Sequence, residues 1–254
     1  MGSLIAMYPT TRRLTVFALA VLSLGGCRSG NPYQGMTDVD MYRLGLQKYE
    51  EAEWDDAIKT LDRLLASFAT SEVLPASRLL LAHARFSKGD FLTARSDYQR
   101  FLDRYPGHED ASVAALGVCR SLSELSPIPQ RDQGYTNDAL AICRNVVVDY
   151  AGTPQALEAA ELAAGMRLKL AQKEYLVADH YFRRKLFDSA IMYYEFVVRL
   201  YPDTEWAPMS LLGIYRSNMA IGYDDLAEDA REQILEQYPD SPAASEVRTN
   251  VTGS

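Results

Sequence analysis

The sequence predicts an all-α fold, a solenoid of five helical hairpins in which one long helix joins two halves. Five alanines carry this prediction, because each is followed eleven residues later by an aromatic residue at which a helix is expected to end. In three of the five the next residue is proline, which lacks an N–H and forces its predecessor out of the α region. A stack of helix pairs presents long grooves to other chains and has no reaction centre of its own. The five alanines are Ala57, Ala94, Ala139, Ala190 and Ala227.

The first 26 residues have the composition of a secretion signal. Arg12 and Arg13 precede an apolar run of eleven residues, from Leu14 to Leu24. A helix of that length is too short to cross a bilayer core of about 30 Å. We therefore expect residues 1–26 to be a signal peptide that is removed from the mature chain.

The tetrapeptide Leu24-Gly25-Gly26-Cys27 resembles a bacterial lipobox. In signals of that kind diacylglycerol is attached to the cysteine thiol, the peptide is cut before the cysteine, and the new amino group is acylated. Several acyl chains hold a protein stably on a membrane, whereas one chain binds marginally. We therefore expect lipid attachment at Cys27 and a lipidated tether over residues 27–37; the alternative is a plain cleaved signal with an incidental cysteine. Arginine, not aspartate, follows Cys27, which by the same resemblance implies the outer membrane.

The charge balance of the mature chain excludes one class of partner. Without residues 1–26 the chain has 24 basic and 34 acidic residues, a formal charge of −10, and no long basic run. Proteins that follow the phosphates of nucleic acids need a basic surface. The sequence therefore predicts a polypeptide partner and no nucleic acid.

Histidines and cysteines indicate no metal and no cofactor. His83, His108 and His180 are far apart and form no metal-binding spacing. Cys119 and Cys143 flank a predicted turn at similar distances, so an antiparallel hairpin would bring them level, and an oxidising periplasm would permit a disulfide. The alternative is a pair of small buried residues without a bond, and we favour it from the sequence.

The hairpins divide into an N-terminal half, residues 38–150 with hairpins 1 to 3, and a C-terminal half, residues 151–248 with hairpins 4 and 5. Residues 249–254 are expected to be a mobile tail. The aromatic ends of successive hairpins are 37, 45, 51 and 37 residues apart, so hairpin 3 has eight extra residues and hairpin 4 has fourteen. The eight lie in 126–133, where two prolines predict a long turn.

The fourteen extra residues lengthen the first helix of hairpin 4. Thr153 is a good N-cap, Pro154 suits the first helical position, and no residue that must end a helix follows before Arg183. Fourteen residues are close to four helical turns, so the insertion nearly preserves the buried face. We therefore expect one continuous helix of nearly thirty residues between the two halves. A short helix is also expected from Ser241-Pro242.

The hairpins resemble the tetratricopeptide repeat. In that family a small residue twelve positions before the repeat alanine lets the two helices of a hairpin cross closely. Gly45, Ala82 and Ala178 stand at this offset. We therefore expect a tetratricopeptide-type solenoid.

In a tetratricopeptide stack the first helix of each hairpin lines the concave face, which in hairpins 1 and 2 would be aromatic and apolar. Aromatic rings give a large contact area at a low entropic cost, so this face suits an extended segment with alternating apolar residues. The alternative is that these side chains pack between hairpins, above all Leu46 and Leu79. The candidate groove residues are Tyr42, Leu46, Tyr49, Leu79, His83 and Phe86.

Arg183, Arg184 and Lys185 are the densest basic cluster, at the expected turn between the helices of hairpin 4. Such a cluster suits an acidic partner or lipid headgroups, and the alternative is a solvated turn. The chain has no pairing of nucleophile and base, no phosphate loop and no metal spacing, so no enzymatic activity is predicted.

The mature chain as a whole resembles the BamD family, the tetratricopeptide lipoproteins of the outer-membrane β-barrel assembly machinery. The most specific part runs from Arg131 to Pro202. Members of the family often have an Asn-Arg pair inside the second helix of hairpin 4, where this chain has Met192-Tyr193, so no contact of that arginine is transferred. The resemblance rests on the lipobox, the five hairpins, the insertion that runs into Arg131-Asp132-Gln133, the segment LKLAQKE at 168–174, and Val177-Ala178-x-x-Tyr181.

The resemblance implies a non-enzymatic assembly factor held by lipid at the periplasmic face of the outer membrane. Its C-terminal hairpins would bind the POTRA region of the barrel subunit BamA. Its N-terminal hairpins would bind unfolded outer-membrane β-barrel proteins, in part through their C-terminal targeting segment. Other lipoproteins of the same machinery are further expected partners. A rival interpretation is another periplasmic tetratricopeptide lipoprotein that acts as a scaffold in envelope biogenesis or division.

Overall fold

The structure, a computed structural model, describes residues 33–249, and within this range the chain forms α-helices and no strands. From Met36 onward the described residues belong to one compact unit. The fold is all-α and of the tetratricopeptide type, as the sequence predicts. The helices are α1 (Asp38–Glu50), α2 (Trp54–Ser67), α3 (Leu74–Lys88), α4 (Phe91–Arg104), α5 (Ala111–Leu125), α6 (Gly134–Asp149), α7 (Pro154–Arg183), α8 (Phe187–Leu200), α9 (Trp206–Ile221), α10 (Asp224–Gln237) and α11 (Pro242–Thr249).

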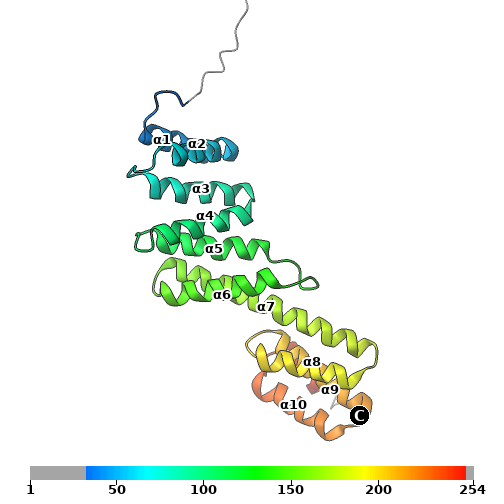
Figure 1. Cartoon of the computed structure of the whole chain (residues 1–254). Helices are drawn as coiled ribbons and strands as arrows, with labels where there is room; N and C mark the ends of the chain where they lie inside the picture. Colours follow the sequence, from blue (N-terminus) through cyan, green and yellow to red (C-terminus); the bar gives the residue numbers. More distant parts are fainter. Residues whose placement is uncertain (1–32, 250–254) are drawn as a thin grey trace, which may run out of the picture. The chain divides into compact units, whose positions relative to one another are not determined.

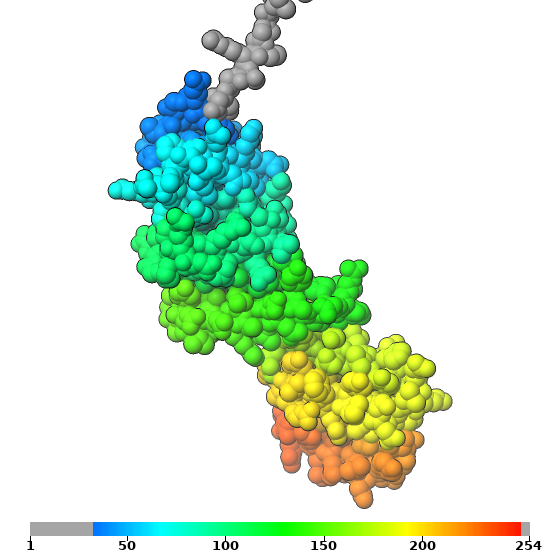
Figure 2. Space-filling model, viewed as in Figure 1, coloured from blue at the N-terminus to red at the C-terminus, as the bar shows by residue number. Residues whose placement is uncertain are grey.

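Successive helices pair as hairpins, α1 with α2, α3 with α4, α5 with α6, α7 with α8, and α9 with α10. Each hairpin also contacts the next one along the chain, so the hairpins stack in sequence order (Figure 1). In the space-filling view they follow one another as bands of colour (Figure 2). The last helix, α11, packs against α9 and α10.

The helix ends lie where local chemistry places them. Thr37 and Asp40 form a capping box at the start of α1, each side chain accepting from the backbone N–H of the other. Helices α4, α8 and α10 each end directly before the tyrosine of a Tyr-Pro dipeptide. This confirms the predicted stop signal.

In four of the five hairpins the turn contains one residue in the left-handed conformation, five positions before the repeat alanine. Glycine occupies this position in two hairpins, as Gly89 with φ 88° and Gly222 with φ 79°. Ala52 and Lys185 occupy it in two others, with φ 58° and 61°. Residues with a Cβ are strained in this conformation, so these two turns carry a cost that the glycine turns avoid.

Small residues allow the two helices of a hairpin to cross closely, as predicted. A Cβ added at Gly45 would lie 2.8 Å from Cδ2 of Leu61, which is closer than side chains approach each other. Ala82 and Ala178, at the same position in other hairpins, are fully buried.

A second close contact joins neighbouring hairpins. The ring of Tyr98 on α4 lies against Gly117 on α5, and the ring of Tyr194 on α8 lies against Gly213 on α9. A Cβ at either glycine would meet the ring at 2.6 Å or 2.4 Å, respectively. Both tyrosines are 2% exposed, so the rings are enclosed and the two backbones approach to the limit that glycine permits.

The disulfide is the first correction to the sequence interpretation. Cys119 on α5 and Cys143 on α6 are bonded to each other, whereas we favoured unbonded cysteines from the sequence. Both cysteines are fully buried, as expected, in a core cluster with Leu116 and Val146. The bond joins the two helices of hairpin 3 across the long turn.

The predicted long helix is confirmed as α7, which spans 30 residues. The Thr153 hydroxyl caps it by accepting from the N–H of Ala156 at 3.2 Å, and Pro154 is its first residue. The N-terminal part contributes Ala159 to the core shared with α5 and α6, and the C-terminal part contributes Ala178 to the core shared with α8 and α9. One helix therefore takes part in the cores of both halves.

Polar contacts fix α7 to both halves near its middle. Lys169 donates through Nζ to the Ser126 hydroxyl at 2.8 Å, at the start of the long turn 126–133. Gln133 holds that turn closed by donating to the carbonyl oxygens of Ile128 and Arg131 at 2.9 and 3.0 Å. Its side chain is 3% exposed, so the predicted long turn is well packed at this point.

On the other side, Arg167 binds the Asp203 carboxylate through two nitrogens, at 2.6 and 2.8 Å. It also donates to the Leu200 carbonyl oxygen and lies over the ring of Tyr201. Asp203 lies in the connection between α8 and α9, so Arg167 ties α7 to the C-terminal half.

The two ends of the chain lie mostly outside the residues that the structure describes. The signal peptide 1–26, Cys27 and residues 250–254 fall outside residues 33–249. The expected short helix is present as α11, and it includes Thr249, which we assigned to the tail. None of the helices in the described range has both the length and the apolar character that a membrane span requires.

Candidate functional site

The predicted groove residues come from two neighbouring helices. Tyr42, Leu46 and Tyr49 lie on α1 and are half-buried, packed against a core cluster that includes Leu80 and Leu81 of α3. Their outer atoms remain accessible. Their packing between hairpins is therefore present, and their role in lining a groove stays a prediction.

Two rings at the C-terminal ends of α1 and α3 are each supported by a second aromatic ring. Tyr49 packs on Trp54 with ring centres 5.1 Å apart, and Phe86 packs edge-on against Phe91 at 5.2 Å. The Tyr49 hydroxyl is 3.5 Å from the Ser87 hydroxyl, which links α1 to α3. Supported rings lose little side-chain entropy when a partner binds.

The other two candidates on α3 differ from each other. Leu79 is 8% exposed and belongs to the core of hairpins 2 and 3, so it is not available as a groove residue. His83 is half-buried, and its Nδ1 is 2.7 Å from the Tyr98 hydroxyl. Burial, with a smaller contribution from the positive Arg120, lowers the pKa of His83, which favours a neutral ring at pH 7. The aromatic face therefore consists of Tyr42, Leu46, Tyr49, His83 and Phe86.

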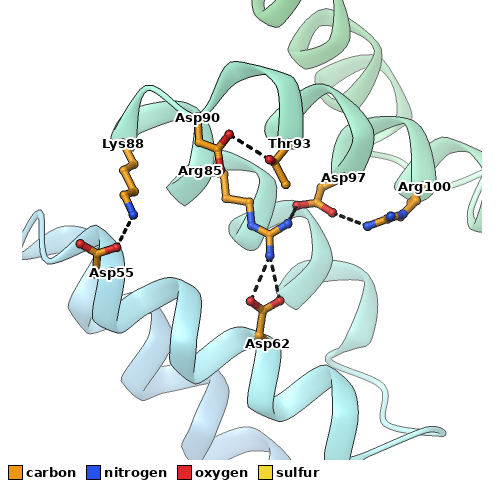
Figure 3. Close-up of polar contacts among 8 residues, drawn as sticks. All are labelled: Asp55, Asp62, Arg85, Lys88, Asp90, Thr93, Asp97 and Arg100. Carbon is orange, nitrogen blue, oxygen red and sulfur yellow. Dashed lines mark hydrogen bonds and ion pairs between the residues drawn. The ribbon is translucent and has the colours of Figure 1, made fainter.

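A charged network that the sequence did not reveal braces hairpin 1 against hairpin 2 (Figure 3). Arg85 of α3 donates to both Asp62 oxygens on α2, at 3.0 and 3.1 Å, and to Asp97 on α4 at 2.6 Å. Lys88 of α3 is paired with Asp55 of α2. Three helices are thereby held together next to the aromatic face.

Asp97 is the most enclosed group of this network. Its side chain is 8% exposed and also accepts from Arg100 at 3.0 Å. Burial raises the pKa of Asp97, and the positive charges of Arg85 and Arg100 oppose that rise. The close ion pair between Arg85 and Asp97 fixes the orientation of both side chains. The network therefore helps to fix the orientation of α3 relative to α2 and α4.

A second candidate surface lies in the C-terminal half, in a hollow lined by α8, α9 and α10, which we name the C-terminal groove. Tyr223 and Leu226 on its edge are 54% and 52% exposed, so large apolar side chains face solvent there. The only sequence signal was a pair of apolar residues around the acidic Asp224-Asp225. The apolar lining comprises Ile191, Val198, Leu211, Ile214 and Leu226.

Charged side chains surround this apolar lining. Asp188, Glu195 and Asp229 contribute carboxylates and Arg199 contributes one guanidinium. The net charge of these side chains is negative, which favours a partner that presents apolar side chains flanked by basic ones.

The basic cluster lies in the turn that the sequence predicts. Arg183 ends α7 and pairs with Asp179 at 2.8 Å, one helical turn earlier. Arg184 and Lys185 follow, and all three residues are exposed. Lys185 is the strained left-handed residue of this turn, so a charged side chain stands where two other hairpins have glycine.

Comparison with protein families places most of the chain in one of them. The model of the YfiO family, described as outer membrane lipoprotein, matches residues 34–234. The matched range includes the aromatic face, the charged network, the long helix and the whole C-terminal groove.

Curated relatives share the same designation. The chain is 25% identical to the outer membrane protein assembly factor BamD of Caulobacter vibrioides over 74% of its own length and 62% of that protein. It is 22% identical to BamD of Rickettsia prowazekii, covering 91% of this chain and 93% of that one. BamD of Vibrio cholerae is 24% identical, with 87% and 96% covered.

Solved structures with a similar fold include the TPR2AB domain of yeast Sti1 in a complex with pHSP90, at a TM-score of 0.45 and 12% identity over 84% of each chain. A thermophilic TPR protein of Thermus thermophilus gives a TM-score of 0.35 at 18% identity, with 85% of this chain and all of that one covered. At these scores the likenesses carry no argument about sites or partners.

Proposed function

The chain belongs to the YfiO family of outer membrane lipoproteins, and from this premise we propose that it is a scaffold for the assembly of outer-membrane β-barrel proteins. It acts by binding polypeptides and not by catalysis. Two separate candidate surfaces, one in each half, support this proposal: the aromatic face and the C-terminal groove. A scaffold that hands a substrate to a partner needs two such surfaces.

The aromatic face is proposed to bind unfolded outer-membrane β-barrel proteins, in part through their C-terminal targeting segment. A β-strand segment of such a protein places apolar side chains on every second residue. The half-exposed rings of Tyr42, Tyr49 and Phe86 give contacts for side chains of this kind. The network around Arg85 supports the proposal because it holds α3 in place beside the face.

The C-terminal half is proposed to bind the POTRA region of the barrel subunit BamA, the partner that the family resemblance implies. The exposed apolar residues of the C-terminal groove, with their acidic surround, provide one contact surface. The turn Arg183-Arg184-Lys185 provides a second, for acidic side chains of the partner. Other lipoproteins of the machinery remain proposed partners without an assigned surface.

Anchoring is proposed to occur through acyl chains on Cys27, at the periplasmic face of the outer membrane. The lipobox Leu24-Gly25-Gly26-Cys27 and the family description support this assignment. Multiple acyl chains then hold the protein without a membrane-spanning helix.

The two surfaces are tested by one double substitution in each, with both variants measured against both ligands. Tyr49→Ala with Phe86→Ala is expected to weaken binding of a β-barrel C-terminal peptide at least tenfold, because a buried aromatic contact is typically worth about 2 kcal/mol. Tyr223→Ala with Leu226→Ala is the matched control and should leave peptide affinity unchanged while it weakens binding of a purified POTRA region. Fluorescence anisotropy measures both affinities, and circular dichroism checks that helicity is retained. Unchanged peptide affinity in the first variant would remove the aromatic face as the substrate site.

A further inference from the structure

Hairpin 2 carries three arginines on a surface that neither the aromatic face nor the C-terminal groove includes. Arg78 of α3 and Arg100 and Arg104 of α4 line one surface pocket together with Asp103. Arg100 and Arg104 are four residues apart, so they lie on the same face of α4. Like charges at this spacing repel each other, so the pair costs the helix some stability.

The hydrogen-bonding capacity of this cluster is largely unused. The Nε of Arg78 is buried and has no hydrogen-bond acceptor. In the part of the chain that the structure describes, neither Arg78 nor Arg104 takes part in an ion pair, whereas Arg100 contacts Asp97 through one nitrogen at 3.0 Å. The carboxylate of Asp103 accepts from Gln99 at 2.9 Å. The guanidinium groups of Arg78 and Arg104 therefore have donors free for an acceptor from outside the chain.

The charge of the pocket selects the kind of anion. Three guanidinium groups and one carboxylate give a formal charge of +2, on a mature chain whose total is −10. A phosphate monoester or inorganic phosphate carries about −1.5 to −2 at pH 7 and so matches the pocket, whereas a carboxylate would leave one positive charge unbalanced. Guanidinium groups also bind phosphate oxygens in pairs, through parallel N–H donors.

We propose that Arg78, Arg100 and Arg104 form a binding site for a phosphate group, either free phosphate or the phosphate monoester of a lipid headgroup. The guanidinium groups of the three arginines donate to the phosphate oxygens. The site shares Arg100 with the charged network around Asp97, but it uses neither of the two surfaces proposed to bind polypeptides.

The test uses the full lipid-anchored protein in neutral detergent, titrated with inorganic phosphate at constant ionic strength, with acetate as the comparison anion. Calorimetry should show saturable phosphate binding, a matching rise in the unfolding temperature, and little response to acetate. Arg104→Gln, at an exposed position that should not disturb folding, is expected to weaken phosphate binding about tenfold or more. Arg78→Gln should do the same, and Arg63→Gln, an exposed arginine of α2 outside the pocket, should have no effect.

A second arm separates the two sources of phosphate. Dihexanoyl phosphatidate and dihexanoyl phosphatidylcholine are titrated under the same conditions. Tighter binding of phosphatidate than of inorganic phosphate, lost in Arg104→Gln, assigns a lipid headgroup, and equal or weaker binding assigns free phosphate. Equal responses to phosphate and acetate, or phosphate binding that survives both Arg78→Gln and Arg104→Gln, would overturn the proposal.

Discussion

Beside the apolar core that each junction has, hairpins 1 and 2 are joined by charged side chains, whereas hairpins 4 and 5 are joined by an aromatic ring contact. In the first pair, Arg85 reaches across to Asp62 of the preceding hairpin. In the second, the Tyr194 ring lies on Gly213 of the following hairpin and close to Tyr175. The same repeat position, four residues after the alanine, is Tyr194 in α8 but Leu61 in α2.

Leu61 lies against Gly45 of its own hairpin, so it does not supply the ring contact that Tyr194 makes with the next one. The charged network is present where that contact is missing. An ion pair depends on direction and is weakened by salt, whereas ring packing depends on shape. The junction of hairpins 1 and 2 and that of hairpins 4 and 5 therefore reach the same stacked arrangement by interactions that respond to different changes; the junction of hairpins 2 and 3 has the ring contact, through Tyr98 and Gly117.

The largest expected effect comes from the covalent bond of hairpin 3, which has no counterpart among the described residues of the C-terminal half. Cys119→Ala with Cys143→Ala removes a link between residues 24 apart in sequence. In the loop-entropy model this costs about 3 kcal/mol of unfolding free energy. Urea unfolding of the oxidised protein measures the loss. Reduction of the wild type should reproduce it, and reduction of the variant should cause no further change; an equal response of both to reductant would contradict the assignment.

An intermediate effect is expected at the ring contact of the C-terminal half. Gly213→Ala places a Cβ 2.4 Å from the enclosed Tyr194 ring, so we expect a loss of about 1–3 kcal/mol from overpacking. Gly165→Ala in α7 is the matched control, since nothing lies within 4 Å of its added Cβ. That change should stabilise the protein by about 0.5–1 kcal/mol through helix propensity. Thermal unfolding followed by circular dichroism gives both values, and the same sign for the two substitutions would refute the close contact.

The smallest effect concerns the strained turns, one in each half. Lys185→Gly and Ala52→Gly should each stabilise the protein by about 0.5–1 kcal/mol, because glycine adopts the left-handed conformation without strain. Only Lys185→Gly removes a charge from the proposed contact with the partner. It should therefore weaken POTRA binding and make that binding less sensitive to salt, whereas Ala52→Gly should leave it unchanged. Equal POTRA affinity in both variants would identify the basic cluster as a solvated turn.

Local signals were enough to predict most of the fold. Thr153 and Pro154 mark the start of α7, and the Tyr-Pro dipeptides mark the ends of α4, α8 and α10, because capping and proline chemistry act within a few residues. The small residues at the helix crossings were found by their spacing. These features need no knowledge of distant contacts.

Features that depend on distant contacts were missed or misjudged. The bond between Cys119 and Cys143 requires the two helices of hairpin 3 to align across the long turn. Gln133 holds that turn closed through hydrogen bonds to backbone carbonyl oxygens, which the spacing of the cysteines does not indicate. Leu79 had the right offset for the groove, but its contacts with α4 and α5 bury it. The C-terminal groove draws side chains from three helices, and Arg85 finds Asp62 in another hairpin. A single sequence does not specify such pairings.

The continuity of α7 has a consequence for how the lengths of related chains can vary. A straight helix turns by about 100° with each residue, so the number of residues between Ala159 and Ala178 sets the angle at which one half is rotated about the helix axis relative to the other. An insertion of a single residue between them would swing the C-terminal groove by about 100° away from its present direction. Insertions of seven or eleven residues would nearly restore the angle. Helix α7 thus sets the rotational phase between the two binding surfaces, and its length can change without loss of that phase only in steps close to whole turns.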